Sequence, residues 1–514
     1  MLISKMYLWI VIIGGAFSFF ASMGIGANDA ANAFATSIGS KALNMKQVIV
    51  LAAIFETLGA VLMGGHVTDT IRKGIADYKC FENQPELLMY GCMWVVLSVG
   101  LWLFLASKYE MPVSTTHSCV GGMIGMTIAL AGPDCVIWYT PVETFPYVGG
   151  VSGIVMSWFL SPLFSSILAA ILFGTMRETV LRKDFNSYRM NYAYSILIGS
   201  TMTINAFFII YKGAKGLGLH NTPLEIALPV ALGIGITSSL ITLPLVPKLK
   251  NYVENKLYIK NCENDNENDN NNDKNNIELK ASGEDTIISD EILNYEIIKN
   301  QNTLNIKSAR ELSRIVDLHN NAEKFNEKTE EVFKYLQVFT AICDAFSHGA
   351  NDVANAIGPF AVIYTIYQSN GELTKKTSMG DNAYWILGIG GIGIAVGLFV
   401  YGYKITHAIG EKLCKITPSR GVAIELSSAL VIITGSRLKM PLSTTHCQVG
   451  ATVGIGLMEN PKKCSGINCN IFGKTVFGWL LTCVIVGTTA GILTAQGTYS
   501  PAIKGWGYTN STLI

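Results

Sequence analysis

Long apolar runs separated by short polar breaks occupy most of the chain. Each run, such as residues 87–106 or 153–173, is close to the roughly 20 residues with which a helix crosses a bilayer core of about 30 Å. Counted between polar breaks, the runs predict about twelve crossings, near residues 6–27, 46–65, 87–107, 112–131, 147–174, 193–212, 223–246, 335–365, 383–403, 421–436, 441–458 and 473–495. The pattern therefore predicts an all-α integral membrane protein in which some segments are broken or re-entrant helices.

The apolar pattern stops in the middle of the chain. Residues 248–332 are polar and charged, and residues 261–276 have the sequence NCENDNENDNNNDKNN. Such a segment cannot bury a core, so it is predicted to be disordered, with a short amphipathic helix at ELSRIVDL from Glu311. The sequence thus divides into an N-terminal membrane half (1–247), a polar segment (248–332) and a C-terminal membrane half (333–514).

The composition excludes an ordinary soluble protein. Of the 514 residues, 50% are hydrophobic and 15% are charged, against about 25% charged in soluble domains. The net charge of +1 provides no electrostatic basis for binding nucleic acid. No C-x-x-C pair indicates a zinc or redox site, and the sequence leaves open whether Cys464 and Cys469, which share a polar loop, are paired or free.

Positive charges in the short loops predict the orientation. The loop 177–189 carries four basic residues, whereas the loop 131–147 carries none, which places the former in the cytoplasm. Carried along the chain, this puts residues 248–332 inside and both termini outside, with the plasma membrane as the expected location. Arg72 and Lys73 would then lie outside, against the rule.

Three sequence blocks occur twice in the same order. Residues 26–33 (GANDAANA) recur as 349–356 (GANDVANA), residues 111–117 (MPVSTTH) recur as 440–446 (MPLSTTH), and G-x-x-x-x-G-x-x-[VI]-T recurs at 59–68 and 397–406. Seven predicted crossings separate the first pair of blocks. An odd number gives the two halves opposite polarity, which predicts two inverted-topology repeats, as in many secondary transporters.

These blocks, and the long polar insert between them, resemble the signatures of the inorganic phosphate transporter (PiT) family, which includes the sodium-dependent phosphate symporters of eukaryotes. The resemblance covers both hydrophobic halves. Ala35 and Gln448 depart from the residues often found at their positions, and neither is an expected ligand. The resemblance implies a membrane transporter, and not an enzyme, with inorganic phosphate as substrate, Na⁺ as coupling ion and no organic cofactor. A homodimer is compatible with it, and the sequence does not decide the oligomeric state.

The M-P-[VL]-S-T-T blocks predict a break followed by a new helix, because proline fits the first turn of a helix but not its interior. Helix starts offer free N–H groups and a partial positive charge, which suit an anion, and hydroxyl groups add donors. With the resemblance, this makes six residues the predicted phosphate ligands: Ser114, Thr115, Thr116, Ser443, Thr444 and Thr445. The alternative is that these hydroxyls only cap kinked helices.

Carboxylates inside apolar segments are costly unless compensated, so they are candidates for function. Their oxygens, with those of neighbouring amides, suit a hard cation such as Na⁺. The predicted cation ligands are Asn28, Asp29, Asn32, Asn351, Asp352 and Asn355, together with Glu56 and Glu425, which the resemblance implies are required. Alternatively, the asparagines cap broken helices and the aspartates pair with a histidine.

The two glutamates are not equivalent under the repeat, since Glu56 aligns with Ile394 and Glu425 with Val96. This non-equivalence predicts different roles, such as a cation ligand for one glutamate and a proton or gating group for the other. His117 and His446 are second-choice ligands that would donate to phosphate or to a carboxylate.

Sodium-coupled phosphate uptake by alternating access is the function that the sequence predicts. Its nearest rivals are an H⁺-coupled transporter and a transporter of another oxyanion such as sulfate. A membrane phosphate sensor that signals through residues 248–332 is a rival of another class.

Overall fold

The computed structural model describes residues 6–143, 147–211, 218–272, 309–371, 373, 384–438, 440, 442–459 and 466–499. Almost all of these residues are helical, and the two short strands β1 (Thr140–Pro141) and β2 (Val148–Gly149) pair in one antiparallel hairpin. The predicted all-α membrane class is therefore confirmed.

The first half contains the following helical elements in chain order: α2 (Leu8–Ile25), η1 (Gly26–Ala30), α3 (Ala31–Ala33), α4 (Ala35–Gly39), α5 (Met45–Gly74), η2 (Tyr78–Phe81), α6 (Pro85–Lys108), α7 (Thr115–Ala131), η3 (Pro133–Cys135), α8 (Gly150–Met176), η4 (Arg177–Leu181), α9 (Tyr188–Ile210), η6 (Leu219–Asn221) and α10 (Leu224–Thr242). The polar segment contributes α11 (Val246–Asn272) and α13 (Ala309–Asn320). The second half contains α14 (Glu327–Gln368), α15 (Tyr384–Tyr401), α16 (Tyr403–Lys412), α17 (Pro418–Arg437), α18 (Thr444–Glu459) and α19 (Cys469–Tyr499).

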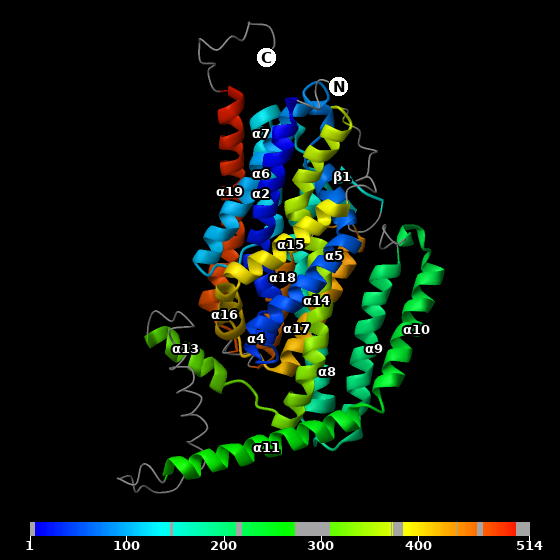
Figure 1. The fold of residues 1–514 in the computed structure, drawn as a ribbon, viewed down its shortest axis with the longest axis vertical. Helices are drawn as coiled ribbons and strands as arrows, with labels where there is room; N and C mark the ends of the chain where they lie inside the picture. The colour runs from blue at the N-terminus through cyan, green and yellow to red at the C-terminus, as the bar shows by residue number, and fades with distance from the viewer. Residues whose placement is uncertain are drawn as a thin grey trace.

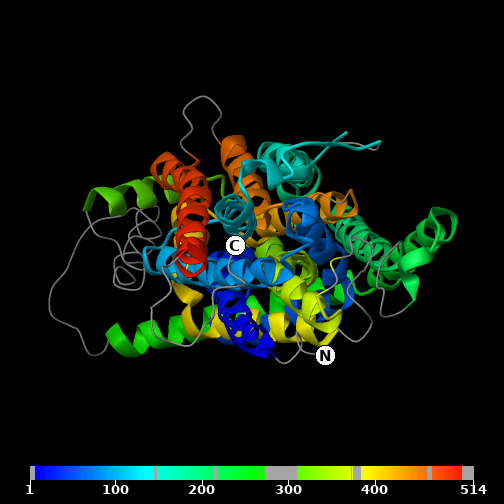
Figure 2. The ribbon, with the colours of Figure 1, turned by 90° about the horizontal axis from the view of Figure 1, so that it is seen from above.

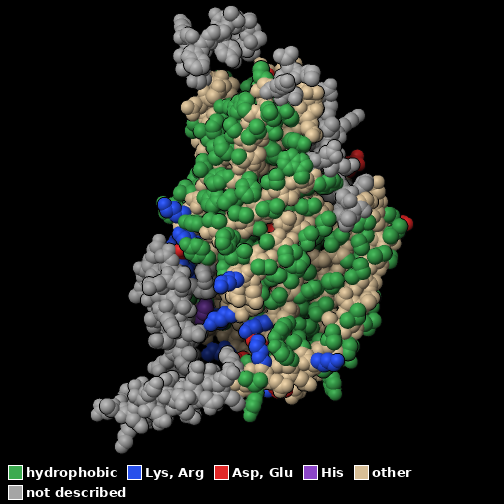
Figure 3. All heavy atoms as spheres, viewed as in Figure 1, with side chains coloured by type: hydrophobic (Ala, Val, Ile, Leu, Met, Phe, Trp, Pro, Cys, Tyr) green, Lys and Arg blue, Asp and Glu red, His purple; other side chains and the backbone are tan. Residues whose placement is uncertain are grey.

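Eight stretches of the described chain are long and apolar enough to cross a membrane. They correspond to eight of the twelve predicted crossings, while α7, α14, α17 and α18 occupy the other four ranges without meeting that criterion. Large apolar side chains such as Phe159 (70% exposed) and Leu480 (67% exposed) face outward, as expected for a lipid-facing surface. Figure 3 shows apolar side chains over most of one face, with Lys and Arg gathered near its lower end.

The helices form an elongated bundle in which the two halves are intermixed (Figure 1). α2 begins and α19 ends at one end of this bundle, and α11 lies across the opposite end. α9 and α10 form a hairpin at the side of the bundle, as Figures 1 and 2 both show. α10 buries little apart from Ala227, Ala231 and Gly235.

Close backbone contacts between the halves recur at the positions that the repeat makes equivalent. A Cβ on Gly26 would lie 1.8 Å from the carbonyl oxygen of Ile394, and a Cβ on Gly349 would lie 2.2 Å from that of Glu56. Only glycine allows backbones to approach this closely. The helices that follow the second pair of blocks show the same relation, because two glycines of α7 lie against the α19 backbone and two glycines of α18 lie against that of α8.

The polar segment is more ordered than the sequence predicts. α11 extends to Asn272, and its first turns are held by the buried side chains of Val246 and Val253 and by an ion pair of 2.9 Å between Lys256 and Glu331. The short helix expected at Glu311 is present as α13. Residues 248–272 are thus helical where the sequence predicts disorder, and residues 273–308 lie outside the described residues.

A disulfide joins Cys80, within η2, to Cys135, at the end of η3. It ties the connection after α5 to the connection after α7. The sequence did not indicate this pair, which is 55 residues apart. Of the two cysteines for which pairing was left open, Cys469 is free and exposed, and Cys464 lies outside the described residues.

Candidate functional site

The two N-D-x-A-N-A motifs have different backbones. The first lies where α2 passes into the π-helical turn η1 and the short helices α3 and α4, an irregularity that often marks functional sites. The second lies inside the long helix α14 without interruption. The aspartates and asparagines of both motifs are at most 2% exposed.

The predicted helix starts are present, because α7 begins at Thr115 and α18 at Thr444. The preceding serines cap these helices: Ser114 Oγ accepts the N–H of His117 at 3.2 Å, and Ser443 Oγ accepts that of His446 at 3.3 Å. The capping interpretation therefore holds for both serines, whose hydroxyl oxygens are engaged in their own helices.

The threonine hydroxyls are directed at the two aspartates. Asp29 accepts hydrogen bonds from Thr115 Oγ1, at 2.7 Å, and from Thr445 Oγ1 of the other half. Asp352 Oδ2 accepts one from Thr444 Oγ1 at 2.5 Å. Two helix starts from different halves thus meet at a pair of buried carboxylates.

The remaining threonine contacts are reciprocal between the halves. Thr116 Oγ1 donates to the carbonyl of Leu442 at 3.0 Å, and Thr445 Oγ1 lies 3.2 Å from the carbonyl of Val113, which shares the single hydroxyl proton of Thr445 with Asp29. Val113 and Leu442 are equivalent under the repeat, as are Thr116 and Thr445. Each helix start is therefore held by the segment that precedes the other.

The four asparagines divide into two pairs. Asn28 and Asn351 hold the segments before the helix starts: Asn28 Oδ1 accepts the N–H of Val113 at 2.9 Å, and Asn351 Nδ2 donates to the carbonyl of Leu442 at 3.1 Å. Asn355 Nδ2 donates to Thr115 Oγ1 at 3.0 Å. The Oδ1 atom of Asn32 is buried without a partner.

A histidine that the sequence did not single out lies between two acids. His348 Nδ1 is 2.8 Å from Glu56 Oε2, and His348 Nε2 is 2.9 Å from Asp352 Oδ2. Ligand atoms of Asp29, His348 and Asp352 all lie within 4.8 Å of one another. The available signal was spacing, since His348 precedes Asp352 by one helical turn on the same face.

Glu425 has a different environment, among neutral donors. Its carboxylate accepts bonds from Thr340 (2.5 Å), Thr36 (2.6 Å), Ser37 (3.0 Å) and Gln337 Nε2 (3.2 Å). Glu56, in contrast, has one charged or chargeable partner and an Oε1 atom without any. The two glutamates differ in surroundings, as their non-equivalence under the repeat predicted.

A small cavity of about 10 Å³ opens beside the aspartates, with room for roughly one water-sized particle. Its lining includes Asp29, His348 and Asp344, a buried acid that the sequence did not single out. Four oxygens of lining residues are buried without partners: Asn32 Oδ1, Asp344 Oδ1, Ser428 Oγ and Gln448 Oε1. Unpartnered buried oxygens of this kind are the hard ligands that Na⁺ requires.

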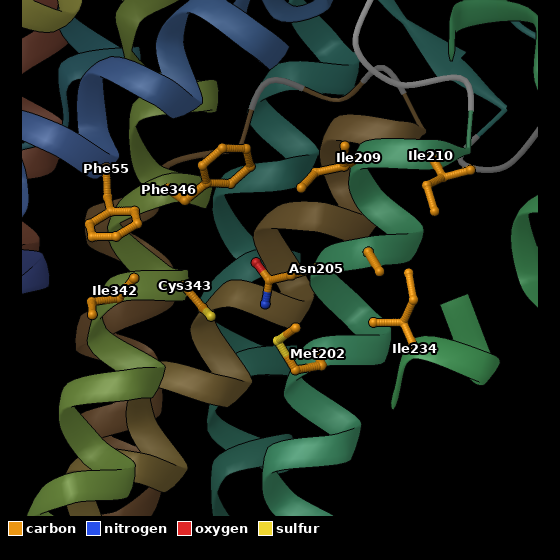
Figure 4. Close-up of a pocket in the computed structure, with 10 residues that line it drawn as sticks. Phe55, Met202, Asn205, Ile209, Ile210, Ile234, Ile342, Cys343 and Phe346 are labelled. Carbon is orange, nitrogen blue, oxygen red and sulfur yellow. The ribbon is translucent and has the colours of Figure 1, made fainter. Parts of the chain in front are cut away.

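A larger cavity of about 360 Å³ lies apart from the aspartates, between α9 and α14 (Figure 4). Its lining is apolar except for Cys343 and Asn205, whose Nδ2 donates to the carbonyl of Thr201 at 2.9 Å. It carries no charge to hold an anion.

His117 and His446 do not contact the aspartates. Their Nδ1 atoms lie 3.1 Å from the carbonyl of Trp479 and 3.0 Å from that of Trp158, and their Nε2 atoms have no partner. The prediction that they donate to a carboxylate is wrong for the described contacts.

Comparison with known proteins assigns the chain. The model of the phosphate transporter family matches residues 25–490, which include both motif pairs and both halves. The chain belongs to the phosphate transporter family. This family consists of transporters and not of enzymes.

Relatives and a solved structure agree with the assignment. The chain is 28% identical to the phosphate-repressible phosphate permease of Neurospora crassa, over 97% of this chain and 98% of the relative. It is 26% identical to sodium-dependent phosphate transporter 1 of Rattus norvegicus, over 95% of each chain. A solved structure titled "The sodium-dependent phosphate transporter" is 28% identical and superposes with a TM-score of 0.72, covering 96% of this chain and all of the other.

Proposed function

We propose that this phosphate transporter moves inorganic phosphate together with Na⁺ by alternating access. The observation that carries the proposal is the meeting of two helix starts, from different halves, at Asp29 and Asp352. Hydroxyl and N–H donors at Thr115, Thr444 and Thr445 are the groups that would bind the phosphate oxygens.

Charge gives the reason for a coupling cation. Asp29, Asp344, Asp352 and Glu56 are buried together with one histidine, so an incoming phosphate would face an excess of negative charge. Cations bound among these carboxylates would remove that repulsion and free the threonine hydroxyls for phosphate. The partnerless oxygens around the small cavity fit Na⁺, and two of the compared proteins are named as sodium-dependent.

The repeat supports alternating access. Reciprocal contacts at Gly26 and Gly349, and at Thr116 and Thr445, indicate two related halves around one site. Two halves of opposite polarity can rock or gate against each other and expose the site to each side in turn. The inverted polarity and the count of twelve crossings remain predictions.

We also propose that both termini lie outside the cell and α11 in the cytoplasm, in the plasma membrane. The disulfide between Cys80 and Cys135 supports this orientation. It lies near the end of α7, where the carbonyl of Ala129 accepts a hydrogen bond of 3.1 Å from Tyr499 at the end of α19. The disulfide and the end of α19 are therefore on the same side of the membrane. Disulfides persist on the oxidising side of the membrane. The basic residues Lys183, Arg189 and Lys248 are exposed near the opposite end.

Epitope accessibility tests the orientation. Antibody should bind a tag placed after residue 514 on intact cells, whereas a tag between residues 280 and 281 should need permeabilised cells. The reverse pattern would refute the proposed orientation.

Uptake of radiolabelled phosphate into proteoliposomes tests the transport proposal. We expect an inward Na⁺ gradient to raise the initial uptake rate at least about tenfold over a choline gradient, with no effect of a tenfold excess of sulfate. Uptake driven by a pH gradient alone would favour H⁺ coupling, and competition by sulfate would favour a broader oxyanion carrier. Either result would contradict the proposal.

A further inference from the structure

Four aromatic rings form a continuous cluster where the two repeats meet. The ring centroids of Trp158 and His117 are 3.7 Å apart, those of His117 and His446 are 4.6 Å apart, and those of His446 and Trp479 are 3.8 Å apart. The two histidines are equivalent under the repeat, and each is at most 2% exposed. The cluster therefore has the same Trp–His pair on each side of the edge-to-face contact between the two histidines.

Each histidine is bound to the opposite half of the chain. His117, in the first half, is bonded to the carbonyl of Trp479 in α19, and His446, in the second half, is bonded to that of Trp158 in α8. A carbonyl only accepts, so the Nδ1 atom of each ring carries the proton and donates. The Nε2 atoms are buried without partners, which leaves Nδ1 as the atom through which each histidine acts.

Proline explains why one of these carbonyls is available. Pro162 lies inside α8, four residues after Trp158, and has no N–H with which to close the helical bond to the Trp158 carbonyl. His446 supplies the missing donor. The carbonyl of Trp479 has Cys483 four residues later in the continuous helix α19, so it has a donor in its own helix besides His117.

The histidines follow directly after the threonines of the site. His117 comes after Thr115 and Thr116, and His446 comes after Thr444 and Thr445, all within the first turns of α7 and α18. In a rigid helical turn, a displacement of the histidine displaces these hydroxyls as well.

We propose that His117 and His446 are positioning residues that set the separation of the two phosphate-binding helix starts, without touching phosphate themselves. The inference rests on the proposed phosphate site. His446 contributes more to this positioning than His117, because Pro162 offers no N–H to the Trp158 carbonyl that His446 binds.

Asparagine and glutamine substitutions separate this role from a general need for a polar side chain. The amide nitrogen of asparagine lies near the position of histidine Nδ1, whereas that of glutamine lies near Nε2. We expect H446N to keep the KM for phosphate within about threefold of wild type and H446Q to raise it at least about tenfold. H117N and H117Q should differ in the same direction by less.

The readout is initial phosphate uptake in proteoliposomes at saturating Na⁺, followed by Na⁺ activation at saturating phosphate. The half-saturating Na⁺ concentration should stay within about twofold of wild type in all four variants, since the histidines do not contact the carboxylates. W158F keeps the backbone carbonyl and a stacking ring, and should stay within about threefold of the wild-type KM.

The following outcomes would contradict the inference. Equal KM values for the asparagine and glutamine variants would exclude a role for Nδ1, as would failure of H446N to accumulate in the membrane. A change in Na⁺ activation with an unchanged phosphate KM would place the histidines in the cation site. Wild-type protein without Na⁺-dependent phosphate uptake would instead refute the proposed function.

Discussion

Replacing either aspartate of the site by asparagine is expected to reduce phosphate uptake at least about 100-fold. D29N and D352N preserve volume but remove the charge, and they place an NH₂ group against threonine hydroxyls that now donate to the carboxylate. A hydrogen bond to a charged group contributes about 1.5–3 kcal/mol, which corresponds to roughly 10- to 150-fold, and the proposed cation ligand is lost as well.

Uptake of radiolabelled phosphate, normalised to the amount of protein in the membrane, measures this effect. D134N is the matched control, because Asp134 is an exposed carboxylate in η3, away from the site. It should transport as wild type does. If D29N or D352N kept more than about a third of wild-type uptake, that aspartate would not be part of the transport site.

Changing Glu56 and Glu425 singly to glutamine is expected to impair transport in two different ways. E425Q places an NH₂ group among four donors, of which Thr340 at 2.5 Å and Thr36 at 2.6 Å are the closest. We propose Glu425 as a cation ligand, so the loss of its charge is expected to raise the half-saturating Na⁺ concentration at least about tenfold. E56Q removes the charge beside His348 and should lower the maximal rate at least about tenfold with little change in Na⁺ activation.

Uptake measured as a function of Na⁺ and of phosphate distinguishes the two defects. E82Q serves as the control, since Glu82 is exposed at the end of η2, and it should leave both parameters unchanged. Identical defects in E56Q and E425Q would contradict the division of roles, whichever parameter they changed.

Local chemistry explains which parts of the site could be predicted. Proline followed within a few residues by serine and threonine, after a polar break, favours a helix start, so the beginnings of α7 and α18 followed from the sequence. A carboxylate in an apolar helix is costly in any membrane protein, which singled out Asp29 and Asp352. The duplicated blocks showed that these features belong together.

Other residues carried weaker signals or none. His348 and Asp344 lie in the apolar part of α14, and only their spacing of four and eight residues before Asp352 connects them with the site. All four motif positions are asparagines. Asn28 and Asn351 bond the segments before α7 and α18, whereas Asn32 and Asn355 face the site. Identical side chains of one motif therefore make different contacts, and the packing around them decides which.

The sequence by itself determined an all-α membrane protein of two related halves, the positions of the helix starts, and the buried acids of the phosphate transporter family. Only the tertiary structure decided which of these groups meet. Asp29 accepts a bond from Thr445, which is 416 residues away, and Glu56 pairs with His348, which is 292 residues away. Contacts over such separations depend on how complete helices pack, and glycines at Gly26 and Gly349 set that packing by letting the backbones of the two halves touch. Local sequence patterns therefore predict the helices, whereas the site forms only where helices of the two halves pack together.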